Sequence, residues 1–295
     1  MRNLIFPLAL FFIFKSNVYA NRNAFTSPSC FSMGGAGSLF LSANAQIKNP
    51  AVLNKSRSIT TSIVRYPAFI SSQSLDLNFP FNNFVFSSSF KHLSYGVFKG
   101  YNENGEDIGS YRSNETWVDG YLSKEMNSYP ILLGSSISLK SANFSSLNIK
   151  TLFTSIGAIG YFKNKNNAVG LSINQIGLKL TDQQTSYISP NFILGGSKKL
   201  NYLPAIIYLD FLIEKQYKTE IFMGACFSVS NTAKILVGSS NRKFDQNTSQ
   251  SLFRSLLGAT GFGFEYDFNQ ILVQYGFYYY GTGIRVDGLS IRVKF

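Results

Sequence analysis

Few residues in this chain have side chains that could bind a metal or drive catalysis. His92 is the only histidine, and it lies far in sequence from Cys30 and Cys226, the only two cysteines. A single imidazole supplies neither a metal site nor a Ser-His-Asp set, and the chain has no HExxH motif and no phosphate-binding loop. An oxidising compartment permits a bridge between the two cysteines, although one pair does not make a disulfide framework. We therefore expect neither a metal nor any other cofactor.

Glu265 and Asp267 are the carboxylates whose spacing best suits a catalytic pair, because they fall on one face of an alternating run. Two carboxylates about 5 to 10 Å apart can cleave glycosides. A porin-like barrel can also be an acyl hydrolase, but no histidine stands near to support that chemistry. The sequence therefore predicts a protein that is not an enzyme.

The composition requires an extensive buried or lipid-facing surface. Of the 295 residues, 45% are hydrophobic, 16% are aromatic and only 14% are charged. So many apolar residues exclude an intrinsically disordered chain. No apolar run beyond residue 20 approaches the ~20 residues of a membrane-spanning helix, so a helical membrane protein is excluded as well.

Residues 1–20 have the pattern of a secretory signal peptide. Arg2 gives a positive start, residues 4–14 are an unbroken apolar run, and residues 18–20 end in Ala20 at a small-residue cleavage site. The run is too short to span a membrane. The sequence therefore predicts an exported chain that is cleaved after Ala20.

The basic charge of the chain is dispersed. The formal net charge is +12, and loss of the predicted signal peptide removes Arg2 and Lys15 from it. The remaining cations occur mostly in short polar stretches such as 163–167, 198–199 and 242–243, without the interleaved aromatics of a nucleic-acid surface. We expect solvated loops and no nucleic-acid partner.

From Ser58 onward, apolar residues alternate with small or polar ones, which is the pattern of strands with two different faces. Ile221, Met223 and Phe227 lie on one face of such a run, and Gly224 and Cys226 lie on the other. Alternation alone fits a soluble sandwich or an outer-membrane barrel. The signal peptide, the aromatic excess and the C-terminal aromatic, a feature typical of chains that the outer-membrane insertion machinery recognises, favour the barrel.

Length predicts the size of this barrel. Residues 58–295 would hold about 14 antiparallel strands at roughly 15 to 20 residues for each strand and turn. Turn signals include Asn104-Gly105 and residues 267–269. The fold class that we predict is therefore all-β, a transmembrane antiparallel barrel over residues 58–295. Its inward positions are largely Gly, Ser and Asn, which predicts a roomy lumen.

The segment before the barrel carries a recognisable constellation. Residues 31–37 read FSMGGAG, residues 42–45 read SANA, and residues 49–53 read NPAVL. These motifs resemble the N-terminal signature of the PorV/PorQ family, which is related to FadL-type outer-membrane barrels. The polar hairpin at residues 101–111 and the ending at residues 281–295 are similar to the family's as well.

The resemblance implies a short hatch or plug at residues 21–57, inside the mouth of the barrel. The alternative is an ordinary leading strand and turn. One departure is that Leu41-Ser42 stands where the family usually has an acidic pair, although Ser42 could cap a short helix. The candidate residues are those of the hatch motif and the C-terminal insertion signal: Met33, Gly34, Gly35, Gly37, Ser42, Asn49, Pro50, Ala51 and Phe295.

The resemblance leaves two functions open. PorV/PorQ-type barrels act with the type IX secretion apparatus, so the chain could be an export component whose partners are secreted proteins or the translocon. FadL-like barrels are passive transporters, so its partners could instead be hydrophobic small molecules. In both cases we expect contact with outer-membrane lipid and with the barrel-insertion machinery.

Overall fold

The structure is a computed structural model that describes residues 27–40, 48–102, 104–126, 129–144, 147–162, 166–181, 185–215, 218–245, 258–280 and 284–295. The predicted signal peptide and Ser42 lie outside these ranges. The N-terminal part contains a five-residue helix, α2 (Pro28–Ser32), and a 3-10 turn, η1 (Asn241–Asp245), follows the twelfth strand.

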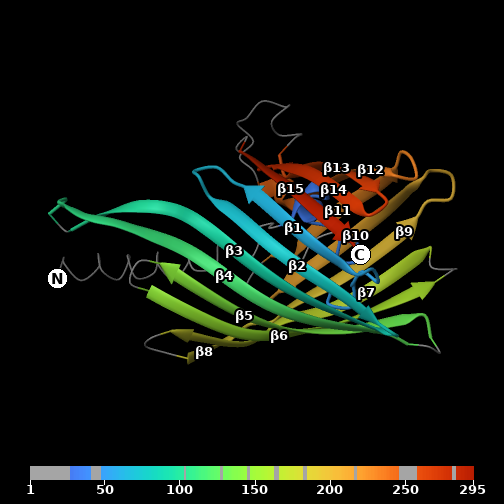
Figure 1. The fold of residues 1–295 in the computed structure, drawn as a ribbon, viewed down its shortest axis with the longest axis horizontal. Helices are drawn as coiled ribbons and strands as arrows, with labels where there is room; N and C mark the ends of the chain where they lie inside the picture. The colour runs from blue at the N-terminus through green and yellow to red at the C-terminus, as the bar shows by residue number, and fades with distance from the viewer. Residues whose placement is uncertain are drawn as a thin grey trace.

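The rest of the described chain is mostly strand. The strands are β1 (Ser58–Arg65), β2 (Ser71–Phe81), β3 (Phe84–Tyr101), β4 (Asp107–Glu125), β5 (Ile131–Phe144), β6 (Leu147–Phe162), β7 (Asn167–Thr181), β8 (Thr185–Ile188), β9 (Asn191–Lys199), β10 (Ala205–Glu214), β11 (Glu220–Ser228), β12 (Ala233–Ser240), β13 (Thr260–Phe268), β14 (Ile271–Tyr279) and β15 (Arg285–Lys294). They form one sheet in which every pairing is antiparallel, and β1 pairs with β15 (Figure 1).

The sheet closes into a barrel because β6 also pairs with β7. Strands β8 and β9 follow one another along β7, and the break between them falls at Ser189-Pro190, where proline has no N–H for the ladder. Together they occupy one strand position, so the barrel has 14 strands. The structure thus confirms the predicted fold class and strand number.

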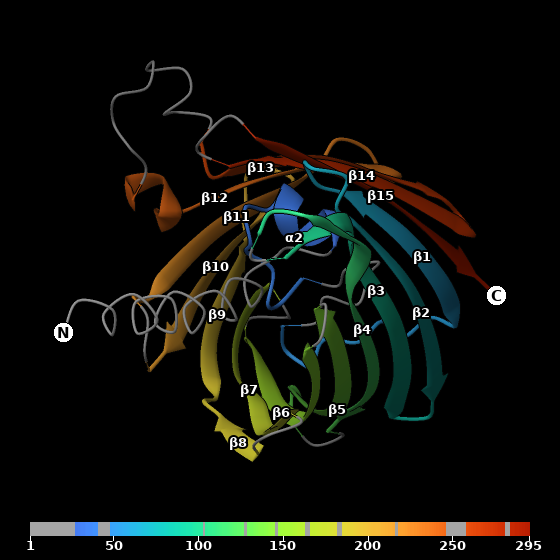
Figure 2. The same cartoon turned by 90° about the vertical axis from the view of Figure 1, so that its left-hand side faces the viewer.

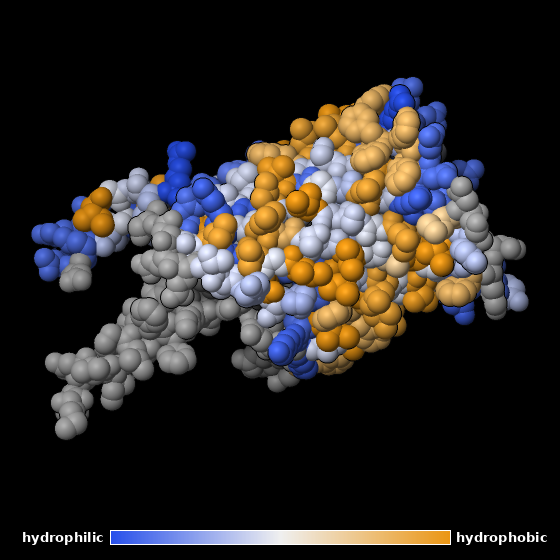
Figure 3. All heavy atoms as spheres, turned by 90° about the horizontal axis from the view of Figure 1, so that it is seen from below, coloured by the Kyte–Doolittle hydropathy of each residue, from blue (hydrophilic) through white to orange (hydrophobic). Residues whose placement is uncertain are grey.

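The two faces of the wall are those that the alternation predicts. On β11, Met223 is 58% exposed on the outside, whereas Phe222 and Cys226 are buried inside. Figure 3 shows apolar side chains over the middle of the barrel wall and hydrophilic side chains gathered toward its two ends. No helix in the described ranges is both long enough and apolar enough to cross a membrane.

The two rims of the barrel differ. We call the rim where β1 begins and β15 ends the turn end, and the opposite rim the loop end. Strands β3 and β4 are the longest, and they project far beyond the loop end (Figure 1). Pairing with β2 stops at Ser94 and pairing with β5 begins at Asn114. Residues 95–102 and 104–113 therefore form a two-stranded ribbon, and neither of its outer edges pairs with another described strand.

Candidate functional site

The N-terminal segment lies inside the barrel. We call residues 27–40 and 48–57 the inner segment. Seen along the axis from the loop end, α2 lies within the ring of strands (Figure 2). Phe31 and Met33 are both 0% exposed, and they pack in one apolar cluster with residues of β10, β11, β12, β14 and β15.

Inward-facing glycines provide the space for this segment. At ten of them, a Cβ atom would lie within 3.0 Å of an atom of the inner segment, a separation that real Cβ atoms do not show. They lie on nine strands, and we call them the glycine girdle: Gly134, Gly157, Gly170, Gly195, Gly224, Gly238, Gly261, Gly263, Gly276 and Gly288. At Gly238 and Gly261 the obstructing atoms belong to the backbone of Met33 and Phe31, which cannot move aside as a flexible side chain can.

The inner segment occupies the room that the small inward residues provide. The sequence predicts a roomy lumen for the barrel wall and a segment that fills it, and residues of the inner segment lie directly against the girdle glycines. Many girdle glycines face one another across strands, as Gly238 does with Gly224 and with Gly261. On these strands the inner segment therefore contacts a continuous stretch of backbone that carries no side chains.

Asp210 anchors the first half of the inner segment. This carboxylate lies on β10 and is 1% exposed. Its Oδ2 accepts hydrogen bonds from the backbone N–H groups of Gly37 and Ser38, both at 2.8 Å, and its Oδ1 accepts one from Ser38 Oγ at 2.6 Å. Gly37 has a φ of 118°, a conformation that glycine adopts without strain. Hydrogen bonds to a charged acceptor are the strong kind, so this is a firm attachment.

Asn49 anchors the second half. Its Nδ2 donates to the carbonyl oxygens of Ala158 and Leu171, both at 3.3 Å, and its Oδ1 accepts from the N–H of Ala51 at 3.0 Å. The carbonyl oxygen of Ala51 in turn accepts a hydrogen bond from Ser123 on β4 at 2.9 Å. The residues of the Asn-Pro-Ala motif therefore attach the segment to β4, β6 and β7.

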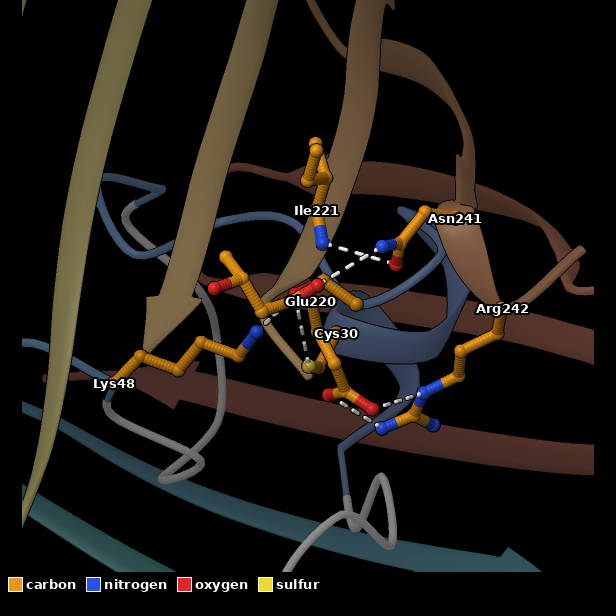
Figure 4. A network of polar contacts seen from close by, with 8 residues as sticks. Cys30, Lys48, Glu220, Ile221, Asn241 and Arg242 are labelled. Carbon is orange, nitrogen blue, oxygen red and sulfur yellow. Dashed lines mark hydrogen bonds and ion pairs between the residues drawn. The ribbon is translucent and has the colours of Figure 1, made fainter. Parts of the chain in front are cut away.

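A third set of contacts joins the inner segment to η1 (Figure 4). Arg242 makes two hydrogen bonds of 2.9 Å to Glu220 at the start of β11. The side chains of Lys48 and Arg242 both lie over the ring of Phe222, at 4.3 and 5.6 Å from its centroid. Lys48 also donates to the carbonyl oxygen of Gly35 within the inner segment. The loop after β12 and the inner segment thus meet at one buried ring.

The cysteines are separate thiols. Cys30 lies on α2 and Cys226 on β11, both are buried, and they are not bridged. Burial raises the pKa of the Cys30 thiol, although nearby Lys48 opposes this shift. A buried thiol with a raised pKa reacts slowly, which makes Cys30 a reporter of whether the inner segment is in place.

The structure places the sequence-predicted residues in three groups. Met33, Gly34, Gly35 and Gly37 lie together next to β11 and β12, whereas Asn49, Pro50 and Ala51 lie next to β5 and β6. Phe295 lies apart from both at the turn end; it is 67% exposed, and its N–H donates to the carbonyl oxygen of Arg57 at 3.2 Å.

Sequence reasoning missed Asp210 and the seat formed by the girdle. The available signal for the girdle was the recurrence of glycine at inward positions of successive strands. In the described part of the chain, no group of three His, Cys, Asp or Glu residues could hold a metal. The site holds a segment of the chain inside the barrel, by packing against the wall and by a few buried hydrogen bonds.

Comparisons with known proteins bear on the fold. No family model matches the sequence, and no curated protein does. The chain is similar to the crystal structure of the Pseudomonas putida toluene transporter TodX, with a TM-score of 0.61 at 13% identity over 90% of this chain and 96% of that one.

Two further solved structures agree. The Ralstonia pickettii toluene transporter TbuX matches with a TM-score of 0.61 at 10% identity, over 93% of this chain and 99% of that one. A Pseudomonas aeruginosa FadL homologue matches with a TM-score of 0.56 at 10% identity, over 92% and 98%. At identities this low, the structural similarity establishes the fold alone, and this fold is the antiparallel β-barrel of these three solved structures.

Proposed function

We propose that this chain is a passive transporter of hydrophobic small molecules in the outer membrane, and that the inner segment is its plug. The observation that carries the proposal is the seat of the inner segment: glycines on nine strands and the buried Asp210 hold it across the lumen. A barrel of about 14 strands is too wide for its own side chains to close, so an added segment is what closes it. Passage then requires the plug to shift.

The location follows from the wall and the ends of the chain. An apolar outer face suits lipid, and the predicted signal peptide delivers the chain for insertion with Phe295 as its terminal signal. The barrel begins with β1 and ends with β15 at the turn end. We place this end in the periplasm, because the long hairpins of such barrels, here β3 and β4, extend outside the cell. The ribbon of residues 95–102 and 104–113 faces the cell exterior.

The export role is the weaker candidate. It depends on the N-terminal resemblance to PorV/PorQ, and the motif residues that carry this resemblance are buried inside the barrel: Met33, Asn49 and Ala51 are at most 1% exposed. Residues so placed cannot contact a secreted protein, and their packing against the wall accounts for their types. The two solved structures of similar fold that are named toluene transporters support the transporter role instead.

The test is uptake by bacteria whose intact outer membrane excludes apolar dyes. Cells that produce the chain should take up N-phenyl-1-naphthylamine faster than cells with an empty vector. The same cells should show no gain in uptake of a hydrophilic sugar of similar mass. Equal dye uptake with and without the protein would refute transport, and equal gains for dye and sugar would indicate an unselective pore.

A further inference from the structure

A row of aromatic side chains runs from the ribbon into the lumen along the inner face of β3, β4 and β5. On the ribbon, the rings of Phe98 and Tyr111 stack with centroids 5.5 Å apart. At the rim, the rings of Tyr95 and Phe144 lie 5.6 Å apart. Trp117 lies deeper on β4, on the same face as Tyr111, since inward positions alternate along the strand.

Two lysines flank Trp117. Lys91 on β3 and Lys140 on β5 are its cross-strand partners, and their Nζ atoms lie 5.6 and 4.9 Å from the ring centroid. The charge of Lys140 is compensated by an ion pair of 2.7 Å with Glu115, which also accepts a hydrogen bond from the Tyr95 hydroxyl at 3.0 Å. The Glu115 carboxylate is thus committed to these two groups.

Lys91 differs from Lys140. It is 8% exposed, and among the described residues neither a hydrogen bond nor an ion pair within 4.0 Å joins its ammonium group. Asp119 interacts with it electrostatically from beyond that distance and is itself hydrogen-bonded to Ser138 and Tyr121. A buried cation without a hydrogen-bond acceptor is costly.

We propose that this wall is a binding site for a small aromatic carboxylate. The ring of the ligand stacks on Trp117 and on the Tyr95–Phe144 pair, and its carboxylate accepts hydrogen bonds from Lys91 Nζ. The stacking surfaces select a planar ring over an aliphatic chain. The Lys91 ammonium, which has no hydrogen-bond acceptor among the described residues, selects an anion over a neutral hydrocarbon. The inference rests on the proposed transport function and specifies its substrate class.

Trp117 is the only tryptophan in the chain, so tryptophan fluorescence, excited selectively over that of tyrosine, reports on this site alone. The full-length protein in detergent is titrated with 4-nitrobenzoate, a contact quencher. Quenching should saturate, benzoate should relieve it, and hexanoate and toluene should relieve it far less. Quenching that rises linearly without saturation, or relief by hexanoate as strong as by benzoate, would overturn the proposal.

Lys91→Met should weaken 4-nitrobenzoate binding at least about tenfold, because a charge-assisted hydrogen bond is lost. Lys91→Arg should restore most of the affinity. The matched control is Lys124→Met, since Lys124 is an exposed lysine of the neighbouring strand β4, and it should bind as the unaltered protein does. Undiminished binding by Lys91→Met would refute the role of this lysine.

Dye uptake separates this proposal from the transport function. If Trp117 quenching fails to saturate while cells still take up N-phenyl-1-naphthylamine through the protein, the transporter stands and the aromatic carboxylate site is wrong. If quenching saturates and no compound crosses, the site stands and transport is refuted.

Discussion

Replacing Asp210 with asparagine should release the first half of the inner segment. The carboxylate accepts three hydrogen bonds, two from backbone N–H groups at Oδ2 and one from Ser38 at Oδ1. Asparagine keeps one oxygen and places an amide NH₂ where the other oxygen stood. The remaining oxygen can face the two N–H groups and the NH₂ can donate to Ser38 Oγ, so the three contacts stay but lose the negative charge. A neutral hydrogen bond contributes about 1 kcal/mol less than a charge-assisted one, so the change costs about 3 kcal/mol in total. This loss weakens the attachment of the inner segment and not the barrel itself, because the hydrogen bonds between the strands are unchanged.

Cys30 supplies the assay. In a Cys226→Ser background, the rate at which a maleimide labels Cys30 follows the fraction of molecules in which α2 has left its seat. A loss of 3 kcal/mol raises that fraction by about a hundredfold, so Asp210→Asn should label at least about a hundred times faster than the background protein. The control is Asp107→Asn, an exposed aspartate of the ribbon whose carboxylate accepts a hydrogen bond from the N–H of Gly109 at 2.8 Å. Labelling of Asp210→Asn at the background rate, with the barrel still folded, would refute the reasoning.

Three further changes test the wall and the plug. Met223→Arg should destabilise the barrel by about 2 to 4 kcal/mol in a lipid-based unfolding assay, whereas Ser228→Arg at the strand end should cost less; equal costs would mean that the faces are wrongly assigned. Gly261→Val should weaken the binding of the inner segment to the wall by about 1 to 3 kcal/mol and so speed the labelling of Cys30. Gly120→Val, on the outer face, should leave the labelling rate unchanged. Deletion of residues 32–47 should leave a folded barrel with a higher conductance in planar bilayers, and an unchanged conductance would show that the segment is no plug.

The barrel could be predicted because its signal is local. Period-two alternation on strands such as β11 assigns each residue a face without any knowledge of its neighbours, and the length of the chain sets the number of strands. The start of β1 at Ser58 and the turns at Gly105 and Asn269 follow from equally local residue types.

The seat of the plug could not be predicted because its signal is not local. Which glycines face one another depends on the register between strands. Gly238 lies on β12, far along the chain from Met33, so their contact depends on how all the strands between them pair. Asp210 is one inward residue of β10 among several, and nothing beside it in sequence marks it as the acceptor for Gly37 and Ser38. The small inward residues predict room inside the wall, but they do not show which part of the chain lies there, since small residues indicate close approach of backbone as readily as empty space.

A reversible covalent lock on the inner segment tests the central claim most directly. Ser38 Cβ lies 3.3 Å from where a Cβ of residue 195 would stand, close to the ~3.5–4.5 Å of bridged cysteines. The variant combines Ser38→Cys and Gly195→Cys with serine at Cys30 and Cys226. In the reduced form the new side chain at residue 195 crowds residue 38 and loosens the segment, so that only the bridge holds it. Dye uptake is measured on the same cells before and after reduction. A plugged transporter should take up N-phenyl-1-naphthylamine only when reduced. Equal uptake by the oxidised and reduced protein would contradict the account, because transport would then not require the inner segment to move.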